Sequence, residues 1–272
     1  MSSYREVGGP GAQGVGSLDR VTTDSPDPLA PLVALPGVAE ASEAARAALA
    51  AVHRHPANRR GWATTAAESV LRGARASAGV EGASVWLDGD GVDDEVLAGA
   101  LRVAGALTGE SLDRGVAVWT RSPLQELAHL HLLAASGPGV DPGSLGRPRT
   151  DPGVAERLQG LAELVTGGTR VPAPVLAAVV LGELSALRPF GSADGIVARA
   201  AFRLVGVSTG LDPHSLGVPE VTFYRDPAGH RAALDGFVAG TPDGVAAWIV
   251  HCCGALEAGA REATSIADAA GG

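Results

Sequence analysis

The sequence contains no lysine, because all 21 of its basic residues are arginines. Mechanisms that need a lysine amine, such as a Schiff base or the phosphate contact of a P-loop, are therefore excluded. Cysteine is also scarce, with only Cys252 and Cys253 in 272 residues. Neighbouring positions on a helix point in different directions, which favours two buried thiols over a metal site or a vicinal disulfide. Unlinked cysteines suit a reducing compartment, and we expect a cytoplasmic protein.

Long apolar runs and a basic surface are missing too. No apolar stretch approaches the ~18 residues that a membrane-spanning helix needs, and no charged segment followed by an apolar one marks a secretory signal. A net charge of −9 and a pI near 5.2 disfavour nucleic acid and anionic lipid as partners. Residues 1–30 are rich in Gly, Ser, Asp and Pro, which predicts a flexible tail. Its GxGxxG match, Gly9 to Gly14, follows no strand and gives no support for an oxidoreductase.

Helical periodicity dominates the rest of the chain and predicts an all-α fold. We expect one domain over residues 31–266 and a disordered end at 267–272, and a small β-hairpin flap around Val85-Trp86-Leu87 is left open. His53 and His55 flank a predicted helix end, where exposed side chains are favoured over a metal pair. The predicted helices cover residues 39–53, 62–78, 96–107, 122–136, 151–165, 171–187, 195–207, 230–238 and 242–266.

Twelve residues between two of these helices, Arg188–Arg199, form the segment around which the chain is organised, called here the core segment. They read Arg-Pro-Phe-Gly-Ser-Ala-Asp-Gly-Ile-Val-Ala-Arg and combine a short turn with the start of the helix predicted at 195–207. The N-terminus of that helix presents free backbone N–H groups and a positive dipole end to whatever the turn faces. We therefore expect an anion site, and any active site, at the core segment.

The core segment resembles the signature of the Fic (Fido-fold) family, HPFx[DE]GNGRxxR, at the same length. In that family the His deprotonates a target hydroxyl, the acidic residue holds Mg²⁺, and the Gly-Asn-Gly-Arg turn cradles nucleotide phosphates. Typical members transfer AMP from ATP to a protein side chain. Pro189, Phe190, Gly195 and Arg199 match the signature. The resemblance implies a Fido-like helical domain and is strongest over residues 60–256.

The chemical positions of the signature are changed. Arg188 stands at the position of the base, and a guanidinium is protonated and has no acceptor, so it cannot take a proton. Ser192 replaces the metal-binding carboxylate, and Asp194 brings a negative charge to the phosphate site. Ala193 replaces the first glycine and Ile196 the first arginine. A positioned base is worth ~10²–10⁴-fold in rate, so we expect no catalytic residue, no metal, no cofactor and no AMP transfer by the usual mechanism.

A second point of resemblance lies before the core segment. Ser77, Glu81 and Gly82 match [ST]xxxE[GN], the inhibitory motif that many Fic proteins carry on a helix preceding the core. In that family the Glu pairs with the last Arg of the signature and blocks productive placement of the ATP γ-phosphate. The matching arginine here is Arg199, so we expect Glu81 and Arg199 within salt-bridge distance. A structural tie between two helices is favoured over a live regulatory switch. His131 resembles a buried histidine common in Fic domains.

Two hypotheses from different classes stay open. The favoured one is a catalytically silent Fido-like domain with a binding or regulatory role, acting through a protein partner, with a homodimer left open. The alternative is a divergent nucleotidyl- or phosphate-group transferase, with ATP and Mg²⁺ as cofactors, or a binder of an anionic ligand. Under the alternative, the anion-binding residues would come from the core segment, namely Arg188, Ser192, Ala193, Asp194, Gly195 and Arg199.

Overall fold

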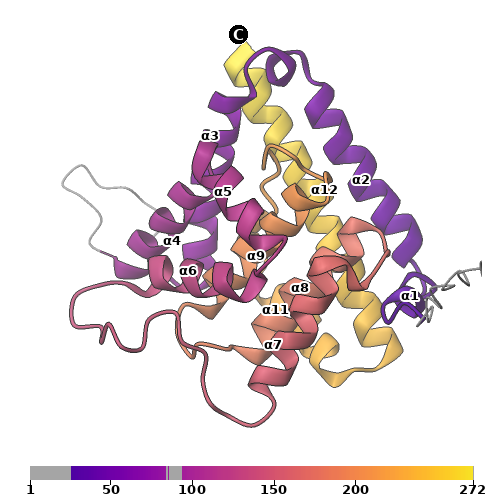
Figure 1. Ribbon diagram of the computed structural model, residues 1–272. Coiled ribbons are helices and arrows are strands. Elements are labelled where there is room, and N and C mark those ends of the chain that lie inside the picture. The colour runs from indigo at the N-terminus through magenta and orange to yellow at the C-terminus, as the bar shows by residue number, and fades with distance from the viewer. Residues whose placement is uncertain (1–25, 84, 86–93, 272) are drawn as a thin grey trace, which may run out of the picture.

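A computed structural model describes residues 26–83, 85 and 94–271 (Figure 1). Within these ranges the chain is all-α, as predicted, and forms no strand. Most of the predicted tail and most of the predicted flap lie outside the described residues. The elements are α1 (Ala30–Val33), α2 (Val38–Arg54), α3 (Pro56–Val80), α4 (Glu95–Ala106), α5 (Gly109–Trp119), α6 (Pro123–Ala135), α7 (Val154–Glu163), a π-helical turn (Leu164–Gly168), α8 (Ala173–Leu187), α9 (Asp194–Ser208), α10 (Glu220–Arg225), α11 (Pro227–Ala239) and α12 (Pro242–Gly271).

The helices α8 and α9 occupy the middle of the fold, and the other helices surround them (Figure 1). In α8, 10 of 15 residues are buried, as expected for a helix that is apolar on all sides. Gly182 lets α12 approach α8 closely, because a Cβ at this position would overlap the rings of Trp248 and Phe237. The indole N–H of Trp248 donates to the carbonyl of Ala178 at 2.8 Å. The core segment therefore starts from a rigidly packed helix.

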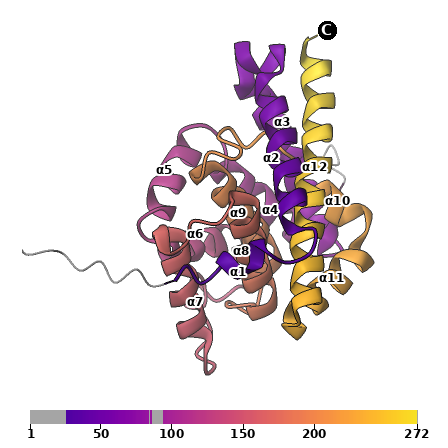
Figure 2. The same ribbon diagram turned by 90° about the vertical axis from the view of Figure 1, so that its right-hand side faces the viewer.

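The long helices α2, α3 and α12 run side by side and extend beyond the rest of the bundle (Figure 2). The apolar sides of these helices contribute to the same hydrophobic core as α8 and α9. Among the described residues, the buried apolar side chains of this core form one cluster that extends from α2 to α12. The segment around Val218 packs closely against Gly259 of α12. A glycine is required there, because a Cβ at position 259 would overlap the backbone of Val218. This layer carries the end of α3, and with it Glu81, to the core segment.

Two predicted chain ends differ from the structure. The disordered end predicted at 267–272 is wrong for residues 267–271, which continue α12. Ala267 is fully buried, and His55 Nε2 lies 3.1 Å from a carboxylate oxygen of Asp268, so tertiary contacts hold this turn. The flexible tail predicted for residues 1–30 is wrong at its end. There, Asp27 accepts hydrogen bonds from the Thr169 hydroxyl and the Arg170 N–H at 2.8 and 2.6 Å.

The helix α5 was not predicted. Its segment contains Gly109 and Gly115, which lower helix propensity. Burial of Leu112 and Trp119 stabilises the helix instead, and Trp119 is completely enclosed. Packing therefore overrides the local preference of this segment.

Candidate functional site

The core segment forms a tight turn between α8 and α9, in which two residues other than glycine adopt the left-handed backbone region. Arg188 ends α8 with φ 47°, and Ala193 precedes α9 with φ 51°. These conformations are unfavourable for residues with a Cβ, so contacts around the turn must hold it. Arg149 provides one of these contacts, because its guanidinium donates to the carbonyls of Leu187 and Arg188, both at 3.0 Å. No local pattern marks Arg149, which lies 39 positions before Arg188.

Asp194 stabilises the turn through a hydrogen bond inside it. The residue is 4% exposed, and its Oδ1 accepts a hydrogen bond from the N–H of Phe190 at 2.8 Å. Burial raises the pKa of this carboxyl, although the Phe190 N–H and the guanidinium of Arg188 lower it. Oδ2 is buried without a hydrogen-bond partner among the described residues. The carboxyl that was expected to face a phosphate is thus used largely inside the turn.

Ser192 is held from the opposite side by His131 of α6. His131 Nε2 lies 3.2 Å from Ser192 Oγ, and Nδ1 accepts from the N–H of Gly146 at 2.9 Å. Because Nδ1 is an acceptor, the proton of the neutral ring sits on Nε2. Burial lowers the pKa of His131, and its ring stacks on Phe190 with centroids 4.2 Å apart. His131 is buried, as the resemblance implied, and positions the turn without reaching the cleft described below.

Ser77 and Glu81, from the motif that resembles the inhibitory one, meet the core segment at Arg199. This arginine is 4% exposed, and its guanidinium donates to Ser77 Oγ at 2.7 Å, to the Ser77 carbonyl at 3.0 Å and to Glu81 Oε1 at 2.7 Å. The predicted proximity of Glu81 and Arg199 is confirmed. Gly82, at φ 84°, turns the chain away after α3. Gly195 has no side chain to obstruct Glu81, because a Cβ there would overlap Glu81 Oε1.

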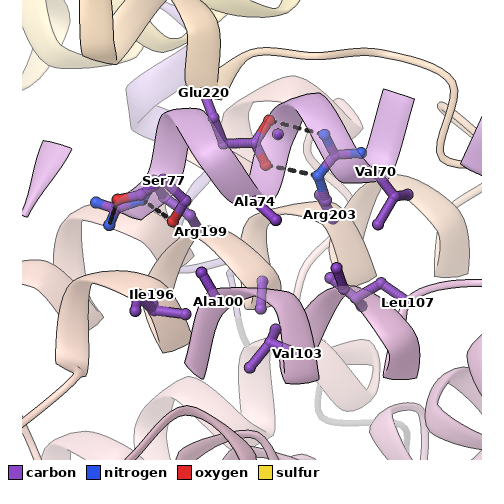
Figure 3. A pocket seen from close by; sticks show the side chains of 13 residues that line it. Val70, Ala74, Ser77, Ala100, Val103, Leu107, Ile196, Arg199, Arg203 and Glu220 are labelled. Atoms are coloured by element: carbon purple, nitrogen blue, oxygen red, sulfur yellow. Dashed lines mark hydrogen bonds and ion pairs between the residues drawn. The ribbon is translucent and has the colours of Figure 1, made fainter. Parts of the chain in front are cut away.

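A second arginine lies one helical turn beyond Arg199 and forms a fully buried ion pair (Figure 3). The guanidinium of Arg203 donates to Glu220 Oε1 at 2.5 Å and to Oε2 at 2.7 Å, and also to the Ser215 hydroxyl at 2.9 Å. The small cavity beneath this pair has a volume of about 20 Å³. That volume is enough for about one water molecule and too small for a ligand. We assign Arg203 and Glu220 a structural role.

A larger cleft of about 360 Å³ opens beside the core segment. It collects Arg188, Ala193, Asp194, Gly195, Arg199 and Glu81 from the predicted sites, whereas Ser77, Gly82 and Ser192 do not line it. Arg188 is exposed, and it has no ion pair with another described residue.

Sequence reasoning missed the wall that α11 adds to the cleft, which includes His230 and Arg231. His230 is 7% exposed, and burial, followed by His251 and Arg199, lowers its pKa to about 3. Its place in the cleft depends on how α11 packs against α8.

Other candidate residues lie away from the cleft. His53, expected to be exposed, is partly buried and pairs with Asp212 at 2.8 Å. Burial raises the pKa of Cys252 well above its ordinary value and that of Cys253 to about 12. Within the described ranges, no three His, Cys, Asp or Glu side chains are grouped to hold a metal ion. The same residues include no helix with the length and apolar character of a membrane span.

Comparison of the chain with models of known protein families finds no match, and comparison with curated proteins finds none either. The resemblance to Fic proteins therefore depends on residues of this sequence itself, chiefly those of the core segment and of the motif at Ser77–Gly82.

Proposed function

We propose that this chain is a Fic-like domain that no longer transfers AMP and acts as a binding or regulatory protein whose cleft takes an anionic ligand. The observation that carries the proposal is that Arg188, an exposed residue, lines the cleft and stands at the position that resembles that of the family's general base. It can hold an oxyanion by donating hydrogen bonds but cannot accept a proton from a hydroxyl group. Affinity for an anion is therefore retained where proton abstraction is lost.

The charge balance of the cleft supports an anionic ligand. Among the described residues, three arginines line it, Arg188, Arg199 and Arg231, against two carboxyl groups, Glu81 and Asp194. Burial raises the pKa of Asp194, and its Oδ1 is already bonded inside the turn. Glu81 lies beside the first turn of α9 and on Arg199, where backbone N–H groups and a guanidinium attract a negative charge. Glu81 thus acts as an internal anion that a ligand would displace.

The histidine of the cleft does not offer an effective base either. His230 is the one histidine among the described residues that line the cleft, and its pKa of about 3 makes the neutral ring a weak proton acceptor. Catalytic bases work best when their pKa lies near the working pH. A divergent transferase, the alternative hypothesis, could therefore not rely on His230 as its base.

The loss of transfer is tested with radiolabelled ATP and Mg²⁺, using the wild-type chain and Glu81→Gly with a cell lysate as the source of targets. We expect no label on the chain or on lysate proteins in either case. Glu81→Gly is included because it removes the group that would block the γ-phosphate. Label transfer by either form would overturn the silent assignment.

Anion binding is tested by calorimetry with pyrophosphate. We expect Glu81→Gly to bind more tightly than the wild-type chain, and Arg188→Gln in the Glu81→Gly background to weaken binding about 3- to 10-fold through loss of a solvent-exposed charged contact. Arg114→Gln is the matched control, because Arg114 is 70% exposed on α5, outside the cleft. Absence of binding to every form would refute the anion cleft. An equal loss in the Arg114 control would show that only the overall charge matters.

A further inference from the structure

Two histidines form a pair in the wall of the cleft. His230 Nδ1 of α11 lies 3.1 Å from His251 Nε2 of α12, and their ring centroids are 5.3 Å apart. His230 lines the cleft and is 7% exposed, whereas His251 is partly buried and does not line it. The pair therefore connects the cleft to the outer side of the bundle.

The hydrogen bond between the rings restricts where their protons lie. One of the two facing nitrogens must donate and the other must accept, because each ring nitrogen either carries a proton or offers a lone pair. If His251 Nε2 donates, His230 carries its own proton on Nε2. That nitrogen has no hydrogen-bond partner among the described residues and belongs to a ring that lines the cleft. In this arrangement His230 is a donor available to a ligand.

The charged groups around the pair decide where an added proton would be held. Burial lowers the pKa of His230 most, and His251, Arg199 of α9 and Arg231 of α11 lower it further. Arg188, the residue that follows α8, lines the same cleft. The rings of Phe223 and Trp248 enclose His230 on its other sides.

His251 is better placed to be charged. Burial lowers the pKa of His251, and Asp226, at the start of α11, opposes this shift. Asp226 acts on His230 in the same direction, but there the charges of Arg199 and Arg231 outweigh it. An added proton is thus held on His251, while His230 stays neutral. His230 Nδ1 then accepts the hydrogen bond from His251 Nε2, and His230 Nε2 is free to donate a hydrogen bond to a ligand in the cleft. Glu81 and Asp194, the carboxyl groups of the cleft, compete with a ligand for the same donors.

We propose that binding of a tetrahedral oxyanion in the cleft is coupled to uptake of one proton by the His230–His251 pair, with His230 Nε2 donating to the anion. This inference rests on the proposed function and adds a residue and a form of regulation to it. The proton comes from solvent, and no covalent bond is made or broken. Burial is the main reason why the pair is neutral, and Arg199 and Arg231 add repulsion at His230. An anion in the cleft offsets that repulsion, so anion and proton stabilise one another's binding. The cleft would then hold phosphate-type ligands more tightly in mildly acidic conditions.

Sulfate is a suitable probe because it does not titrate between pH 5.5 and pH 8. Binding is measured by calorimetry with the Glu81→Gly chain, in two buffers that differ in ionisation enthalpy. We expect binding about 5- to 30-fold tighter at pH 5.5 than at pH 8, with a net uptake approaching one proton, since one linked proton changes affinity by about tenfold per pH unit at most. His251→Gln and His230→Gln should each reduce the pH dependence to less than about twofold, while the amide of His230→Gln keeps a donor in the cleft.

His129→Gln is the control, because His129 lies on α6 outside the cleft and should leave the pH dependence unchanged. Sulfate binding that is independent of pH and takes up no proton would overturn the coupling while leaving the anion cleft intact. The coupling would also be overturned if His230→Gln and His251→Gln, each in the Glu81→Gly chain, both kept the pH dependence of the Glu81→Gly chain. Absence of sulfate binding at every pH would refute the proposed function and this inference together.

Discussion

The two arginine–glutamate pairs of α9 should differ sharply in how much they contribute to stability. Glu220 and Arg203 have side chains that are 3% and 5% exposed, whereas Glu81 is 35% exposed although Arg199 is 4% exposed. Removing one partner of a buried pair leaves an uncompensated charge and costs about 3–5 kcal/mol. Surface pairs contribute ~0–1 kcal/mol. We expect Glu220→Gln to cost about 3–5 kcal/mol.

The cost of Glu81→Gln should lie between the two limits. Water reaches the Glu81 carboxylate, and Arg199 keeps both of its contacts with Ser77 when the charge of Glu81 is removed. We therefore expect a loss of about 1–2 kcal/mol. Such a pair stabilises the contact between α3 and α9 but can open without unfolding the chain.

Urea unfolding followed by circular dichroism measures both variants. Glu257→Gln serves as the control, because Glu257 is 43% exposed in its pair with Arg261 and should change the free energy of unfolding by less than about 0.5 kcal/mol. If Glu81→Gln destabilises the chain as much as Glu220→Gln, exposure does not set the cost. The Glu81–Arg199 pair would then be a structural tie alone.

Three further predictions concern the turn and its surroundings. Arg149→Gln should lower the free energy of unfolding by about 1–2 kcal/mol in thermal melts, because two carbonyls at the end of α8 lose their charged donor. Gly195→Ala should separate Glu81 from Arg199 in a crystal structure, because the new Cβ overlaps Glu81 Oε1; an unchanged ion pair would contradict this. Because the pKa of His230 falls to about 3 in the folded chain, the contribution of the neutral His230 to the free energy of unfolding should be fully present above pH 6.5. It should decline as the pH falls toward 3, because the unfolded chain binds the proton more readily. His230→Phe should lessen this decline in urea titrations, and an identical pH profile would show that His230 does not cause it.

Much of the helical framework is predictable from apolar periodicity. The strongest patterns, such as 171–187 and 195–207, coincide with α8 and α9 to within two residues. Failures occur where packing outweighs local preference, as in the glycine-containing α5 and the last turn of α12. In such segments the buried neighbours, which lie far away in sequence, supply the stabilisation.

The part of the candidate site that was predictable is the contact between the motif at Ser77–Gly82 and Arg199 of the core segment. The spacing of Ser77 and Glu81 placed both on the side of one helix that reaches Arg199. Arg149, His230 and Arg231 reach the same region through tertiary packing alone, and no local pattern marks them. The role of Asp194 was also hidden, because its bond to Phe190 depends on the shape of the turn.

The most direct test of the central claim is a crystal structure of Glu81→Gly grown at pH 5.5 with sulfate. We predict a sulfate ion in the cleft, in contact with Arg199, Arg188 and His230. A cleft without sulfate, in crystals that hold sulfate elsewhere on the chain, would contradict the assignment of this cleft as an anion site.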